Sequence, residues 1–285
     1  MRADAPIPVL DCVPWPMRLH ELTDYLDRYE IKINSRRVDE EYTHYLDSYR
    51  SLYRNRYLPF FERIAQVPSG PYMLRSADEM QELFRQQRDL HSAAARLDEE
   101  LFAALFADPD ESQARSLERI RMARARTRCL GELNRYVAHA DPAVLQDISR
   151  LVMGLGRAGG TAMSDELEGM LFAYEADLTR ALKRIHRQSM SVYVDLFEEV
   201  ERMRAVPRES DNGKSPTMVR QALREQAWER IEDRLKLEAS KIARLHWSIF
   251  RQVSEQLPLR ERLILRHWFL HRASPVAHGS TAADL

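Results

Sequence analysis

The sequence predicts an all-α protein, built as an elongated bundle of long antiparallel helices that pair as coiled-coil-like hairpins. Three observations support this fold class. Charged residues make up 31% and hydrophobic residues 44% of the 285 residues, a ratio typical of amphipathic helices. Glycine and proline are scarce, with 9 and 13 copies, so the chain carries few turn signals. Apolar residues also recur three and four positions apart over most of the chain.

Residues 1–16 are predicted to form an extended arm, because four of them are prolines. Proline lacks a backbone N–H and disfavours helical conformation in the residue before it. Helical periodicity begins at Met17 and continues to about Ile64, and Asn34 and Ser35 mark an irregularity within it.

The clearest coiled-coil spacing covers residues 76–106, where apolar residues alternate by four and three positions. Ser76 and Glu79 form a capping box at its start. A basic helix is predicted over residues 111–138, and Asp141-Pro142 is expected to open a short helix.

The second half contains a glycine-rich segment at residues 154–160, which is the best candidate for a hinge. A long apolar stripe over 167–203 follows, and after a polar linker at 207–216 we expect helices over 219–253 and 258–272.

These patterns divide the chain into five predicted parts: a Pro-rich arm (1–16), a first helical unit (17–140), a connecting helix with the Gly-rich hinge (141–165), a second helical unit (166–272) and a flexible tail (273–285).

The two helical units resemble each other, so an internal duplication is predicted. At an offset of 145 residues, Leu22, Leu26, Tyr29, Glu30 and Ile33 match Leu167, Leu171, Tyr174, Glu175 and Leu178. At an offset of 148 residues, Tyr45 and Phe102 match Tyr193 and Phe250. The change of offset falls near Asn34, and three residues is a length by which helical seams slip.

Residues Gly154, Gly156 and Gly159 match the dinucleotide-binding pattern G-x-G-x-x-G. That pattern binds a pyrophosphate only where a strand leads into a helix N-terminus. The preceding residues have helical spacing instead, so we interpret the segment as a connector and predict no cofactor.

Two histidine patterns raise the question of a metal site. His267 and His271 lie four residues apart, which places two imidazoles on one helix face, but a third ligand must come from another segment. Glu41 and His44 form one Glu-x-x-His step, whereas di-iron bundles need two, and the sequence has no second one. No metal ligand is therefore assigned.

The predicted basic helix contains six arginines, and arginines are 38 of the 43 basic residues of the chain. An arginine stripe can neutralise nucleic-acid phosphates. These arginines occur all around the helix instead of on one face, so a solvated or interhelical ion-pair face is favoured. They are Arg115, Arg119, Arg121, Arg124, Arg126 and Arg128.

Seven tyrosines enrich the first predicted helix, and tyrosine combines a large apolar ring with a polar tip. Two interpretations stay open: a binding surface along a partly open groove, or a bundle core with wet edges. The tyrosines are Tyr25, Tyr29, Tyr42, Tyr45, Tyr49, Tyr53 and Tyr57.

Cys12 and Cys129 lie far apart, and isolated thiols are favoured over a disulfide, which would need an oxidising compartment.

No run of 18 apolar residues is present, so no membrane insertion is expected. The first 15 residues show no signal-peptide pattern. We expect a soluble protein, and the sequence leaves its compartment undetermined.

Within residues 90–124, the run from Leu97 to Phe102 is followed by an acidic turn, then by Gln113 and Leu117-Glu118-Arg119. Together with the tyrosine-rich helix before it, this stretch resembles secreted helical proteins from bacteria. It is distantly similar to the Spy/CpxP-type periplasmic proteins of the LTxxQ group, which are small helical dimers that act as chaperones or stress sensors. This resemblance implies an exposed concave binding surface. Leu26 and Leu182 stand where that motif has glutamine, and no functional residue is carried over.

We therefore expect a protein-interaction module that is not an enzyme: a scaffold or chaperone-like surface that binds a protein partner or a second copy of the chain. The alternative is a helical bundle that binds a metal, through His267 and His271, or a small ligand. A second alternative is nucleic-acid binding through the arginine-rich helix, which is not expected. No catalytic, cofactor-binding or metal-binding residue is assigned.

Overall fold

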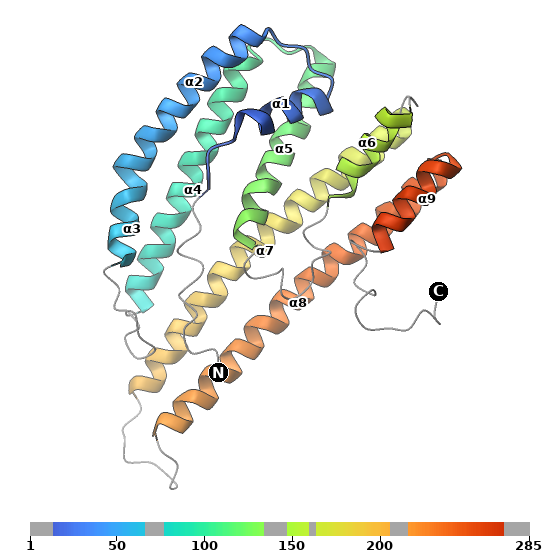
Figure 1. Cartoon of the computed structure of the whole chain (residues 1–285). Helices are drawn as coiled ribbons and strands as arrows, with labels where there is room; N and C mark the ends of the chain where they lie inside the picture. Colours follow the sequence, from blue (N-terminus) through green and yellow to red (C-terminus); the bar gives the residue numbers. More distant parts are fainter. Residues whose placement is uncertain (1–13, 66–76, 134–146, 160–163, 206–215, 271–285) are drawn as a thin grey trace, which may run out of the picture. The chain divides into compact units, whose positions relative to one another are not determined.

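The computed structural model describes residues 14–65, 77–133, 147–159, 164–205 and 216–270, and every regular element in them is a helix. The all-α prediction is therefore confirmed for these residues. The elements are α1 (Leu19–Arg28), α2 (Ser35–Leu52), the π-helical segment η1 (Tyr53–Tyr57), α3 (Leu58–Ala65), α4 (Ala77–Leu105), α5 (Glu111–Leu133), α6 (Ile148–Gly159), α7 (Asp165–Ala205), α8 (Pro216–Gln256) and α9 (Leu259–Trp268), as Figure 1 shows.

The predicted helices agree closely with these bounds. Those over 76–106 and 167–203 correspond to α4 and α7, and those over 219–253 and 258–272 correspond to α8 and α9. The capping residue Ser76 and the dipeptide Asp141-Pro142 lie outside the described residues. None of the described helices combines the length and the apolar character needed to cross a membrane.

Two compact units divide the chain, and each is discontinuous in sequence. Unit 1 takes its described residues from 1–16, 35–105 and 185–235, and unit 2 takes its described residues from 17–34, 106–184 and 236–285. Helices α7 and α8 each contribute residues to both units. The division into consecutive parts that the sequence suggests stays a prediction.

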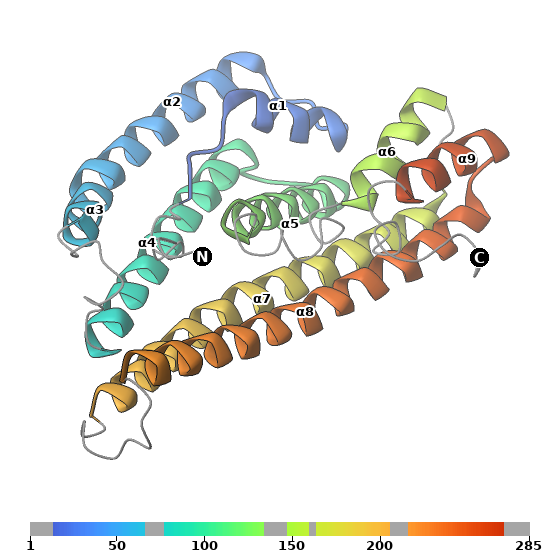
Figure 2. The ribbon, with the colours of Figure 1, turned by 60° about the horizontal axis from the view of Figure 1, so that its bottom comes forward.

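In unit 1, α2 and α4 run antiparallel, and they lie side by side in Figures 1 and 2. Near the start of α2, Arg37 Nη2 donates a hydrogen bond of 2.6 Å to the backbone oxygen of Ala104, near the end of α4. Further along, the Tyr45 hydroxyl donates to Asp98 at 2.8 Å. Buried apolar residues of α4, including Leu90 and Phe102, complete this packing.

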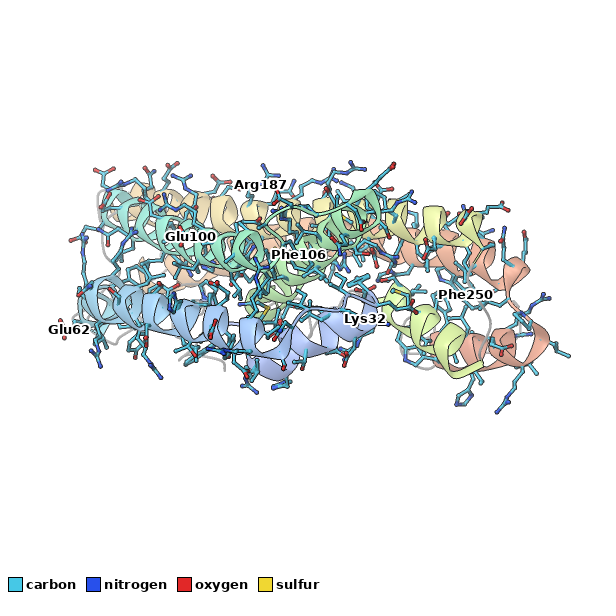
Figure 3. The ribbon with its side chains drawn as sticks, turned by 90° about the horizontal axis from the view of Figure 1, so that it is seen from above. Lys32, Glu62, Glu100, Phe106, Arg187 and Phe250 are labelled. Carbon is cyan, nitrogen blue, oxygen red and sulfur yellow. The ribbon has the colours of Figure 1, made fainter. Side chains whose placement is uncertain are left out.

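In unit 2, the N-terminal part of α7 packs against the C-terminal part of α8, also antiparallel. Ser164 hydrogen-bonds Gln256 at 3.5 Å, and the Tyr174 hydroxyl lies 3.0 Å from His246 Nδ1. Phe250 of α8, labelled in Figure 3, stacks on Phe269 with ring centroids 4.3 Å apart. The latter contact joins the end of α9 to α8.

The predicted irregularity near Asn34 is confirmed, because α1 ends at Arg28 and α2 begins only at Ser35. The end of α1 is a Schellman motif. Ile31 N–H donates to the Leu26 oxygen at 2.8 Å, and Glu30 N–H donates to the Asp27 oxygen at 3.2 Å. Glu30 occupies the left-handed position of this motif with φ 55°, where glycine is the usual residue.

Residues Gly154 to Gly159, predicted as part of a hinge, are helical in α6, and residues 160–163 lie outside the described residues. The apolar stripe of α6 includes Val152 and Met153, which are buried. A helix with one apolar face that packs in unit 2 explains why these glycines do not interrupt the backbone there. The duplication also stays a prediction: Glu30 lies beyond the end of α1, whereas its match Glu175 lies inside α7.

Replacing Glu30 by glycine should stabilise the protein. A non-glycine residue in the left-handed region is strained by roughly 1–2 kcal/mol, and Glu30→Gly removes this strain. We expect the free energy of unfolding, measured by urea denaturation, to rise by about 1 kcal/mol. The matched control is Glu40→Gly inside α2, which should lower it by about 1 kcal/mol. A loss of stability in both variants would contradict the prediction.

Candidate functional site

An open cavity of about 470 Å³ in unit 1 is the candidate site, and we call it the tyrosine groove. One wall is a helical stripe from α2 through η1 into α3, and the other is the segment before α1. The lining residues are Pro14, Trp15, Pro16, Leu46, Tyr49, Arg50, Tyr53, Arg54, Tyr57 and Phe61.

The π-helical turn of η1 has a local cause in Pro59. Proline cannot donate a backbone hydrogen bond, and its ring crowds the carbonyl four residues earlier, here that of Asn55. The helix avoids this conflict by widening, and the Leu58 N–H donates to the oxygen of Tyr53, five residues earlier. The chain then resumes α-helical geometry in α3.

The π turn aligns the aromatic rings of the groove. Tyr49, Tyr53, Tyr57 and Phe61 are spaced by four residues, and each such step overshoots a full α-helical turn by about 40°. A π turn holds more residues, so the step from Tyr53 to Tyr57 falls back toward the starting direction. The rings consequently line one cavity instead of winding around the helix.

The rings differ in burial, which gives the groove a fixed floor and an accessible rim. Tyr49 and Tyr57 are buried, and their hydroxyl oxygens are 3.4 Å apart. Tyr53 packs edge-on against Tyr57 with centroids 6.1 Å apart, but it is 38% exposed. Trp15, on the opposite wall, is 77% exposed. Two large aromatic surfaces therefore face solvent at one cavity.

Arg50 and Arg54 give the groove a positive edge. They lie one helical turn apart, both are exposed, and the described lining holds no carboxylate. Arg50 Nη1 also contacts Asp47 at 2.7 Å, an i,i+3 pair on the helix surface. Burial, together with the neighbouring Tyr57, raises the pKa of the Tyr49 hydroxyl well above its ordinary value. The hydroxyl thus stays protonated and serves as a hydrogen-bonding group.

The structure distributes the seven predicted tyrosines among three roles. Tyr25 and Tyr29 are buried in unit 2, and Tyr45 faces α4 through Asp98. Tyr42 packs on Tyr45 with centroids 5.9 Å apart. Only the last three, at the end of α2 and in η1, line the groove. Sequence reasoning missed Trp15 and the two arginines, although a tryptophan between two prolines was a visible signal.

The arginine-rich helix α5 has a different role, because three of its six arginines are buried in unit 2. Arg119 forms two hydrogen bonds to Glu175 of α7, at 2.8 and 3.1 Å, and Arg124 contacts Glu21 of α1 at 3.1 Å. Arg126 forms an ion pair of 2.9 Å with Asp147. These contacts confirm the interhelical ion-pair interpretation for Arg119 and Arg124, whereas Arg126 pairs with the residue just before α6.

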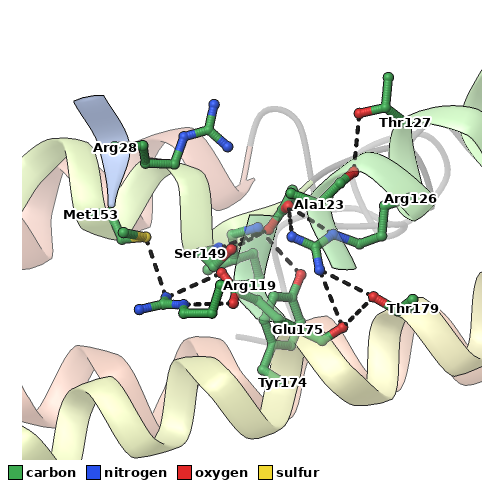
Figure 4. A network of polar contacts seen from close by, with 12 residues as sticks. Arg28, Arg119, Ala123, Arg126, Thr127, Ser149, Met153, Tyr174, Glu175 and Thr179 are labelled. Atoms are coloured by element: carbon green, nitrogen blue, oxygen red, sulfur yellow. Dashed lines mark hydrogen bonds and ion pairs between the residues drawn. The ribbon is translucent and has the colours of Figure 1, made fainter. Parts of the chain in front are cut away.

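The network continues from these pairs, as Figure 4 shows. Arg126 Nη1 donates to the backbone oxygen of Glu175 at 3.2 Å and to the Thr179 hydroxyl at 3.1 Å. The Arg119 guanidinium lies over the Tyr29 ring, 5.0 Å from its centroid. Glu175 and Arg119 are 0% and 6% exposed at their side chains, so the pair is shielded from water. Such guanidinium groups are occupied inside the protein and are not presented to phosphates.

Asp147 and Tyr174, at this network, both have shifted pKa values. Burial would raise the pKa of the Asp147 carboxyl, but the Arg126 guanidinium and the hydrogen bonds from Ser149 outweigh it and hold that pKa below its ordinary value. Burial raises the pKa of Tyr174, whose hydroxyl accepts a hydrogen bond of 3.2 Å from the Ile148 N–H. Both groups brace the start of α6.

The described residues include only one member of each of the predicted pairs His267–His271 and Cys12–Cys129. His267 is exposed on α9, and His271 and Cys12 lie outside the described residues. Cys129 is partly exposed on α5, and His44 is exposed on α2. Among the described residues, no group of three or more His, Cys, Asp or Glu residues could hold a metal ion. Because Gly154 to Gly159 are helical, they also lack the strand-to-helix turn of a dinucleotide site.

A comparison with protein-family models, curated proteins and solved structures finds no significant match for this chain. The resemblance to the Spy/CpxP-type proteins therefore stays a prediction.

Breaking the buried pair in unit 2 should be strongly destabilising. Glu175→Gln leaves the Arg119 charge buried without its carboxylate, which typically lowers the free energy of unfolding by ~3–5 kcal/mol. Asp177→Asn, an exposed neighbour on the same helix, is the control and should change stability by at most about 0.5 kcal/mol. Urea denaturation followed by circular dichroism measures both. Similar losses in the two variants would show that burial of the pair is not what matters.

Asp147 should make stability depend on acid pH. Its pKa is lower in the folded chain than the unfolded value of 3.8, so its stabilising effect is complete above that value and is lost as pH falls through the folded pKa. The stability gap between the native chain and Asp147→Asn should thus be constant from pH 7 to about pH 5, and shrink below about pH 4. Urea titrations at several pH values test this. A gap that stays constant to pH 2.5 would contradict it.

Proposed function

We propose that this protein is a protein-interaction module without catalytic activity, and that the tyrosine groove is its binding surface. The observation that carries this proposal is the composition of the groove. Tryptophan, tyrosine and arginine are the residue types that dominate binding energy at protein interfaces. The groove combines five aromatic side chains with two arginines around one cavity.

The arrangement of the groove also supports binding. Its floor is held by buried rings, and the exposed Trp15 and Tyr53 stand at the rim, where a partner can cover them. Because tyrosine and tryptophan have few rotatable bonds, little conformational entropy is lost when they are covered. The described lining contains no histidine, cysteine or carboxylate to act as an acid, base or nucleophile.

A small apolar ligand is the second candidate, because 470 Å³ lies within the range of about 300–1,000 Å³ that small-molecule pockets occupy. This observation keeps the alternative of a ligand-binding bundle in place. The experiment below separates the two, since only a protein partner is captured by crosslinking between chains.

Crosslinking capture from extracts of the source cells tests the proposal. We expect the native chain to retain a protein that the double variant Trp15→Ser, Tyr53→Ser loses by at least about tenfold, as expected for two interface anchors. Tyr42→Ser, in α2 and outside the groove lining, should retain it. Light scattering of the purified chain identifies the case in which the captured partner is a second copy. Equal capture by all three chains, or none, would overturn the proposal.

A further inference from the structure

We propose that the tyrosine groove binds an extended, proline-containing and acidic segment of a partner protein. This inference rests on the proposed function and names the chemistry of the partner. Its support comes from the length of the groove, from the chain segment that forms one wall, and from the charge at the edge.

The length of the groove fits an extended peptide. Its helical lining positions run from Leu46 to Phe61, which corresponds to about 22 Å of helix at 1.5 Å per residue. A polyproline II segment rises about 3.1 Å per residue, so roughly seven residues cover this distance. An extended segment of this length can contact all of the helical lining positions at once.

The opposite wall shows that these rings accept proline. Pro14 and Pro16 line the same cavity as the tyrosines, and Pro14 is buried. Trp15 precedes a proline, which favours an extended backbone, and residues 14–16 contain no helix. The chain thus already places one Pro-Trp-Pro segment along the tyrosine stripe.

The proposed partner segment would contact the exposed faces of Trp15 and Tyr53 with its prolines. Both rings line the cavity and both are accessible. Aromatic-lined grooves bind proline-rich chains because the polyproline II conformation is preformed, so little entropy is lost on binding. The rings supply apolar area, and the hydroxyl of the exposed Tyr53 can donate a hydrogen bond to a solvated carbonyl of such a chain.

The charge at the edge selects an acidic segment. Arg50 and Arg54 lie one turn apart on the groove, and no acidic side chain is among its described lining residues. Arg50 is paired with Asp47 at 2.7 Å beside the groove, so Arg54 is the main cation that the lining presents. A planar guanidinium matches a carboxylate through paired hydrogen bonds. Glutamates spaced along a bound segment would meet these arginines while the prolines meet the rings.

The test uses fluorescence anisotropy of a labelled decapeptide, Glu-Pro-Pro-Glu-Pro-Pro-Glu-Pro-Pro-Glu, with the full-length chain. We expect saturable binding with a dissociation constant of about 10–100 μM, the strength of a weak, transient contact. A peptide with alanine in place of every proline, and one with lysine in place of every glutamate, should each bind at least tenfold more weakly.

Variants locate the binding. Tyr53→Ala should weaken binding of the decapeptide by about tenfold or more, and Arg54→Ala by about threefold, with the latter effect diminished at high salt. The controls Tyr42→Ala and Arg36→Ala remove the same residue types from α2 outside the groove and should change binding less than twofold. Tyr53 and Arg54 are exposed, so both variants should fold, which circular dichroism verifies.

The outcomes separate this inference from the proposed function. No binding up to 1 mM peptide, equal binding of the alanine peptide, or equal effects of Tyr53→Ala and Tyr42→Ala would overturn the inference. If crosslinking capture still depends on Trp15 and Tyr53, the groove binds a partner of another chemistry and the proposed function stands. If capture also fails, both are wrong.

Discussion

The four-residue spacing of Tyr49, Tyr53, Tyr57 and Phe61 allows all four rings to line one cavity only because the helix between them is not regular. In an uninterrupted α-helix these rings would drift by about 40° at each step and end on different sides. Pro59 removes one backbone donor, and the helix widens into η1 in response. The absence of a single backbone donor thereby determines the direction in which three side chains of the groove point.

The two units use polar groups in opposite ways. In unit 1, tyrosine rings and two arginines line an open cavity, and Tyr53, Arg50 and Arg54 are exposed there. In unit 2, Arg119 and Arg126 of α5 are buried and form ion pairs with Glu175 and Asp147. Buried ion pairs add little net stability, but removing one partner of a pair strongly lowers the free energy of unfolding. Such a network therefore favours the one arrangement of α1, α5, α6 and α7 in which every pair forms. We interpret unit 2 as structural and unit 1 as functional.

Much of the fold could be predicted because helical periodicity is local information. The spacings that marked residues 76–106 and 167–203 depend only on which side of a helix is buried, and those helices formed within a few residues of the predicted bounds. The break before Ser35 was also visible in the pattern. What the periodicity could not supply was the end of α1, where Glu30 takes a conformation normally left to glycine.

The candidate site was predictable only in part. The tyrosines indicated a surface with polar tips. Which three of the seven share a cavity could not be predicted, since that depends on how α2 packs against α4. The pairing of Arg119 with Glu175 was not predicted. Glu175 lies between Tyr174 and Leu178 on an apolar stripe. A carboxylate at a buried position needs a positive partner, so the sequence did contain this signal. Trp15 was missed because residues 1–16 were interpreted only as an extended, proline-rich arm.

The most direct measurement of the central claim is an NMR titration of the chain, carrying labelled aromatic side chains, with the partner that it captures. The account predicts that the Trp15 indole and the rings of Tyr49, Tyr53 and Tyr57 shift together on binding, while Tyr42 does not move. Shifts confined to α9 or α5, with the groove resonances unchanged, would show that partners bind elsewhere and that the aligned rings serve packing alone.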